Sequence, residues 1–133
     1  MTQILQSHFL NLFAMALSDT QIETIELEIL YKIGQEKGIE RSEIDKVILN
    51  ADKVKFTFPD TLDEKIIYLY DFAKIILADG VVAKNERKTL EFFCNRFGFE
   101  EDNIASIADF LLVSAKDNLQ VNDLLIIINE NLN

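Results

Sequence analysis

Acidic residues recur at one spacing in both halves of the chain. Asp19 is followed seven positions later by Glu26, and Asp79 is followed seven positions later by Glu86. Carboxylate oxygens are preferred ligands of hard divalent cations. We therefore treat Asp19, Glu26, Asp79 and Glu86 as candidate ligands of a divalent cation, which would be Ca²⁺, Mg²⁺ or Mn²⁺.

The apolar pattern predicts that these acids face a packed seam. Asp79 lies three positions after Ile76 and extends the apolar stripe of one predicted helix, whereas Glu86 lies four positions before Leu90 and begins the next stripe. The first copy has the same placement. A carboxylate near a core needs hydrogen bonds, a cation or a proton. Asp79 also follows the carboxyl end of a predicted helix, where a cation would neutralise the partial negative charge of the carbonyl groups as well.

The second copy matches only the second half of an EF-hand loop. Asp79, Gly80 and Glu86 fit loop positions five, six and twelve, but positions one and three would be Ile75 and Leu77, which offer no side-chain oxygen. A complete EF-hand is therefore excluded. One Asp and one Glu supply at most four of the roughly six to eight oxygens that Ca²⁺ prefers, so the other half of the chain, backbone carbonyls or water must complete a site of modest affinity.

Two other interpretations of these acids stay open. Glu86 falls near the third position of a predicted helix, where a carboxylate commonly caps backbone N–H groups, and Asp79 and Asp19 would satisfy the turns that follow them. The residue that would complete a capping box is Ala83 in one half and Glu23 in the other, and neither is Ser or Thr. The third interpretation is a recognition surface for a basic partner protein.

The sequence contains no recognisable pattern of catalytic residues. His8 is the only histidine, and we expect it to be a surface or partly buried side chain rather than a ligand. The single cysteine, Cys94, falls in an apolar stripe with Leu90 and Phe97, which predicts a packed and inert thiol. Glycine-rich phosphate loops are absent from the sequence. We therefore expect no enzymatic activity.

Charge and hydropathy restrict the partners. The formal net charge of -10 disfavours nucleic acid and anionic membrane surfaces, because phosphate binding needs clustered Lys and Arg. No apolar run approaches the ~20 residues that span a bilayer, which predicts no direct membrane insertion. The apolar run 9–17 has no Lys or Arg before it, unlike a signal peptide. We expect a cytoplasmic protein whose oligomeric state the sequence leaves open.

The spacing of apolar residues predicts an all-α fold of about seven helices in a single bundle-like domain that covers residues 1–133. The expected helices cover about 3–17, 23–37, a short segment that opens at Ser42, 61–78, 83–97, 101–115 and 121–131. A connector over 52–59 holds the only proline. The last segment could equally be a short buried strand, because residues 124–128 are continuously apolar.

A shift of sixty residues superimposes the two halves without a gap. It aligns seven identical pairs, among them Gly38 with Gly98 and Glu40 with Glu100, besides the Asp and Glu pairs above. These polar and glycine matches carry more weight than apolar ones, which any two amphipathic helices share. We predict an internal repeat of about residues 10–50 and 70–110, whose halves pack around a pseudo-twofold axis.

With this doubled Asp and Glu signature on helical hairpins, the chain resembles the TerB family. That family is named for a tellurite-resistance protein and is also found as the N-terminal domain of a membrane-anchored DnaJ-like co-chaperone. The resemblance covers about residues 9–112, and its best copy is Leu77-Ala78-Asp79-Gly80 followed by Glu86 and Leu90. The chain departs from the pattern at Thr20, where the first copy should have Gly, so the tight bend is harder there.

The resemblance implies an all-helical fold of about seven helices, a stress-linked or regulatory role, and divalent-metal binding through acidic loop residues, with no established catalytic reaction. The leading hypothesis is therefore a noncatalytic module whose acidic turns bind a divalent cation or tune a partner surface. The alternative is a metal-independent protein–protein interaction domain.

Overall fold

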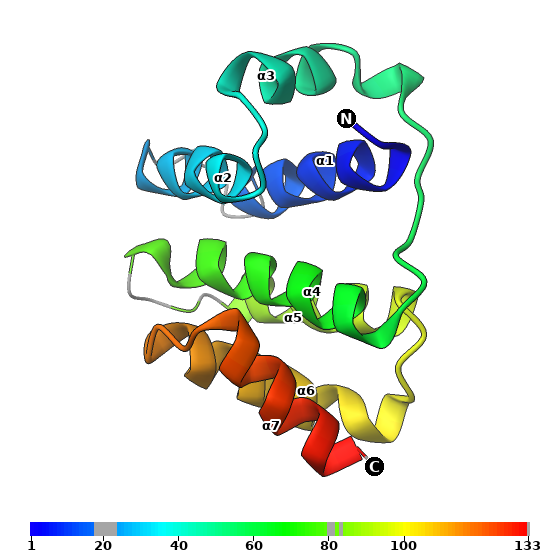
Figure 1. The fold of residues 1–133 in the computed structure, drawn as a ribbon, viewed down its shortest axis with the longest axis vertical. Helices are drawn as coiled ribbons and strands as arrows, with labels where there is room; N and C mark the ends of the chain where they lie inside the picture. The colour runs from blue at the N-terminus through cyan, green and yellow to red at the C-terminus, as the bar shows by residue number, and fades with distance from the viewer. Residues whose placement is uncertain (18–23, 80–81, 83, 133) are drawn as a thin grey trace.

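The computed structural model describes residues 1–17, 24–79, 82 and 84–132 (Figure 1). These residues form seven α-helices and two short 3-10 helices, and they contain no strand. The elements are α1 (Gln3–Leu17), α2 (Thr24–Glu36), α3 (Arg41–Leu49), η1 (Ala51–Lys53), α4 (Leu62–Ile76), η2 (Leu77–Asp79), α5 (Lys84–Arg96), α6 (Glu101–Lys116) and α7 (Val121–Leu132).

The all-α prediction is confirmed, and each helix begins and ends within about two residues of its expected bounds. The open question about the last segment is settled, because 121–132 is a helix and not a strand. Among the described residues, no helix is both long and apolar enough to cross a bilayer.

The helix α4 is the centre of the fold. It lies between α1 and α2 on one side and α6 and α7 on the other, and it also contacts α5 (Figure 1). Residues 69–73 of α4 are consecutively buried, which means that the helix is covered on every side. Asp71 is the one charged residue in that run, so its partners must come from the neighbouring helices.

A connector joins the two halves of the chain. It follows η1 and runs along one edge of the molecule to the start of α4 (Figure 1). The backbone N–H of Thr57 donates to the hydroxyl of Ser7, which ties the connector to α1. At its end, Thr61 is the N-cap of α4, and its side chain accepts a hydrogen bond from the N–H of Glu64.

Most of the predicted apolar stripes are buried or half-buried, but one expectation for α2 is wrong. The spacing of apolar residues in the expected helix 23–37 predicts that Ile25 faces inward. Ile25 is instead 43% exposed, whereas Glu26 is 1% exposed. Adjacent residues of a helix point about 100° apart, so the turn that buries Glu26 moves Ile25 outward. In the first turn of α2, the side chain that faces inward is therefore a carboxylate.

Three helices end in the same turn. Gly38, Gly98 and Asn118 have φ angles of 77°, 94° and 54°. After each of them, a backbone N–H reaches back to a carbonyl five residues earlier, as in the bond from Ile39 to Gly34. This is the Schellman pattern, in which a left-handed residue satisfies the last carbonyls of a helix. The position of Gly38 directly after the expected helix 23–37 predicts that it is the residue that follows the helix end, and its φ of 77° confirms this role.

Replacing Asn118 with glycine should stabilise the protein, since this position alone of the three holds a side chain in the left-handed region. We expect the free energy of unfolding to rise by about 0.5 kcal/mol in urea denaturation. The control is Lys116→Gly, two residues earlier at the end of α6, which should lower the free energy of unfolding by up to about 1 kcal/mol. A loss of stability in Asn118→Gly would mean that the amide side chain, and not the backbone angle, determines this turn.

Candidate functional site

Glu26 and Glu86 are both buried in the first turn of a helix. Each is the third residue of its helix, α2 or α5, and each is 1% exposed. The prediction that these two glutamates face a packed seam is confirmed. The first turn carries backbone N–H groups that lack intrahelical acceptors and the positive end of the helix dipole, both of which favour a carboxylate.

The two predicted aspartates are described less fully. Asp19 lies outside the described residues, and the side chain of Asp79 does too, although its backbone ends η2. The helix η2 packs against α2 and α6 as well as α4. The helix η2, which precedes the bend of the second half, therefore lies beside α2, the helix that carries Glu26 of the first half.

Within the described part of the chain, no three His, Cys, Asp or Glu residues gather as metal ligands. The structure thus places two of the four candidate ligands, Glu26 and Glu86, in buried positions sixty residues apart. Their chemistry is that of oxygen donors.

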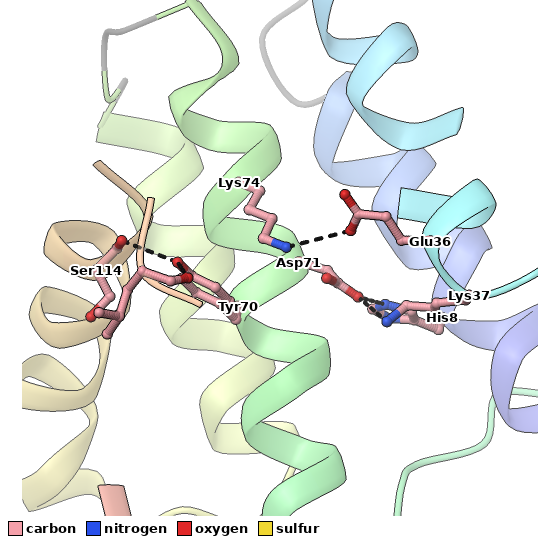
Figure 2. Close-up of polar contacts among 8 residues, drawn as sticks. His8, Glu36, Lys37, Tyr70, Asp71, Lys74 and Ser114 are labelled. Carbon is pink, nitrogen blue, oxygen red and sulfur yellow. Dashed lines mark hydrogen bonds and ion pairs between the residues drawn. The ribbon is translucent and has the colours of Figure 1, made fainter. Parts of the chain in front are cut away.

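A buried ionic cluster, absent from the sequence predictions, joins the two halves. The Nε2 atom of His8 lies 2.8 Å from Oδ2 of Asp71, and the Nζ atom of Lys37 lies 3.1 Å from the same oxygen (Figure 2). His8 comes from α1, Asp71 from α4, and Lys37 follows the last residue of α2. The expectation that His8 is a surface or partly buried residue is wrong, because His8 and Asp71 are each 2% exposed.

The electrostatics of this cluster indicate a neutral histidine beside an ionised aspartate. Burial lowers the pKa of His8 from its ordinary value of 6.5, against the hydrogen bond and charge of Asp71, which raise it. Burial raises the pKa of Asp71, but the hydrogen bond and charge of His8 and the charges of Lys37 and Lys74 outweigh it and hold that pKa below its usual value. The hydrogen bond to Asp71 then places the proton of neutral His8 on Nε2.

The remaining faces of His8 are also covered. Its ring stacks on Tyr68, with centroids 4.0 Å apart and planes 14° apart. Its Nδ1 atom is buried and has no hydrogen-bond partner among the described residues. A second proton on this ring would therefore sit on an unsolvated nitrogen, which disfavours the imidazolium form. This cluster is therefore a structural junction between the two halves.

Cys94 is fully buried, and burial, with the charge of Glu91, raises the pKa of its thiol to about 12. The thiolate is the reactive form, so this thiol is inert at neutral pH. The prediction of a packed cysteine is confirmed.

No family model, curated protein or solved structure matches this chain. The resemblance to the TerB family therefore stays a prediction that depends on the motif residues of the two bends. What the structure adds is the all-helical fold and the buried placement of one acid from each copy of that motif.

Proposed function

We propose that this protein is a noncatalytic, cytoplasmic module with a regulatory, stress-linked role, and that it binds a divalent cation between its two acidic bends. Asp19, Glu26, Asp79 and Glu86 would supply the carboxylates. The observation that carries the proposal is the burial of Glu26 and Glu86, each at 1% exposure, at the same position of two helices. The regulatory role follows from the TerB resemblance alone.

Burial supports a cation because an ionised carboxylate removed from water needs compensating charge or hydrogen bonds. The opening turn of each helix favours a carboxylate at this position, and a cation shared by the two bends would stabilise the ionised form further. The packing of η2 on α2 favours one shared site over two half-sites. Four carboxylates offer up to about eight oxygens, enough for Ca²⁺, whereas Mg²⁺ would keep several waters.

A cation that binds the folded state should raise the melting temperature. At about a hundred times its dissociation constant, the stabilisation is about 2.7 kcal/mol, or several degrees. We expect this shift with at least one of Ca²⁺, Mg²⁺ and Mn²⁺, added separately and followed by circular dichroism. The double variant Glu26→Gln with Glu86→Gln, which keeps side-chain size, should melt at the same temperature with and without the ion.

The matched control is Glu40→Gln with Glu100→Gln. These glutamates are also sixty residues apart and stand at the N-caps of α3 and α6, but they are exposed and make no side-chain capping bond. The control should keep the full shift. An undiminished shift of the melting temperature in the Glu26 and Glu86 variant would mean that the ion binds elsewhere. The absence of a shift with any ion would favour the alternative function.

The alternative is a metal-independent interaction domain, which an exposed aromatic cluster favours. Phe56 and Phe92 are exposed, and together with Phe58 they surround the guanidinium of Arg96 at 5.3 to 5.8 Å from their ring centroids. Aromatic residues and arginine are enriched at protein interfaces. The net charge of -10 would steer a basic partner surface toward this protein. An interaction domain of this kind would melt at a temperature that divalent cations do not change.

A further inference from the structure

A cleft of about 450 Å³ opens between the two halves of the molecule. It lies where α2, the end of α4 with η2, and the turn between α6 and α7 meet. Its volume is in the range of small-molecule sites. A larger hollow of about 640 Å³ is formed by α2 and its turn into α3 alone. Of these two, only the cleft is therefore lined by segments that are distant in sequence.

One wall of the cleft is apolar. Four aliphatic residues from three different segments line it, and all are half-buried, so they leave hydrocarbon surface within reach of a ligand. They are Ile29, Leu77, Leu119 and Val121. Burying such surface against an apolar ligand is favourable in proportion to its area.

The same segments also bring charged side chains to the cleft, with more positive than negative charge among the described lining residues. Lys32 and Lys74 line the cleft, and Glu36 is the one acid among the lining residues that the structure describes. The ammonium of Lys74 lies 3.8 Å from the carboxylate of Glu36, which is exposed (Figure 2). A long, solvated ion pair contributes little, so an incoming anion can take the place of Glu36 beside Lys74. Lys32 is exposed and makes no ion pair with another described residue.

A buried tyrosine fixes one side of the cleft. The hydroxyl of Tyr70 donates to the carbonyl of Leu119 at 2.7 Å and lies 3.1 Å from that of Ser114. This contact fixes the turn between α6 and α7 against α4, on the side away from Asp71 (Figure 2). A wall fixed before binding lowers the entropic cost of binding.

We propose that this cleft binds a small amphipathic anion, specifically a monocarboxylate with a short hydrocarbon chain. The carboxylate would lie by Lys32 and Lys74, and the chain would cover the aliphatic wall. An inorganic anion would leave that wall bare, and a neutral hydrocarbon would leave the two ammonium groups unused. The proposal does not use the cation site, because neither Glu26 nor Glu86, the two acidic bend residues whose side chains the structure describes, lines the cleft.

The test is a titration of the full ¹⁵N-labelled chain with octanoate, followed by backbone amide NMR shifts. We expect saturable shifts at residues of the cleft, and affinity about tenfold weaker or worse in the double variant Lys32→Met with Lys74→Met. The control is Lys46→Met with Lys84→Met, two exposed lysines that line neither hollow and should leave the affinity unchanged. The dispersion of each spectrum shows whether the variant is folded.

Two further probes separate the contributions of charge and hydrocarbon. Inorganic phosphate should need a far higher concentration than octanoate to shift the same amides, and 1-octanol should bind the native protein no better than octanoate binds the Lys32 and Lys74 variant. The proposal is overturned by the absence of shifts, by shifts confined to other surfaces, by phosphate that matches octanoate, or by octanol that binds the native protein as tightly as octanoate.

Discussion

Replacing Asp71 with alanine should lower the free energy of unfolding by about 3 kcal/mol, because it removes one partner of a buried ionic cluster. The Nε2–H of His8 would lose its acceptor in a place that water does not reach. Lys37 would lose its partner too, although it is partly exposed and its ammonium can turn to solvent. Urea denaturation followed by circular dichroism measures the change.

Asp109 is a matched control, because its carboxylate also forms an ion pair. Its carboxylate lies 2.7 Å from the guanidinium of Arg87, but the side chain of Asp109 is 65% exposed. An exposed pair contributes little, so Asp109→Ala should cost about 1 kcal/mol or less. Equal losses in the two variants would show that burial does not set the contribution of the cluster around His8.

Stability should fall as the pH is lowered below 6.5, and His8 should account for the first part of the loss. Burial lowers the pKa of His8 in the folded state, so below 6.5 the unfolded chain binds a proton that the folded chain does not. The slope reaches about 1.4 kcal/mol per pH unit between 6.5 and the lower folded pKa. The pKa of Asp71 is also lowered, so its contribution is present above 3.8 and is lost as the pH falls below that value.

His8→Gln isolates the histidine contribution. The side-chain amide of glutamine can donate to Asp71 as Nε2–H does, but it does not titrate. Because His8 is the only histidine of the chain, the slope just below pH 6.5 should flatten in this variant while the loss at more acidic pH stays. The measurement is urea denaturation at half-unit pH intervals. Parallel pH profiles for the two proteins would show that folding does not lower the pKa of His8.

The fold was predictable from the sequence because its determinants are local. Apolar residues at helical spacing, glycines after helices and few turn residues specify each helix without reference to its neighbours. Ile25 shows the limit of that reasoning. Its spacing fits an inward stripe. In the structure, however, α2 packs against other helices with Glu26, and not Ile25, facing inward.

The cluster around Asp71 was missed because its partners are far apart in sequence. His8 and Asp71 are separated by 63 positions, and no spacing rule connects them. A signal was nevertheless present, since Asp71 lies between Tyr70 and Phe72 and is the only charged residue in the stretch 66–73. A carboxylate there demands a partner, although the sequence does not name it.

The predicted repeat stays a prediction, but several structural features recur at its offset of sixty residues. Gly38 and Gly98 share a left-handed φ, and Glu26 and Glu86 share their burial. His8 and Tyr68, which also differ by sixty, stack on each other. A contact between equivalent residues is what a twofold axis through the interface of α1 and α4 would produce.

The most direct test of the cation site is the broadening of backbone amide NMR signals by Mn²⁺ at a small fraction of one equivalent. Broadening is strongest nearest the bound ion. A shared site predicts that the opening turns of α2 and α5 and the residues of η2 broaden first and together, and that Ca²⁺ or Mg²⁺ in excess restores them. Broadening that begins instead at exposed acids of α6 or α7, or that leaves the first turns of α2 and α5 unaffected, would contradict a cation held by Glu26 and Glu86.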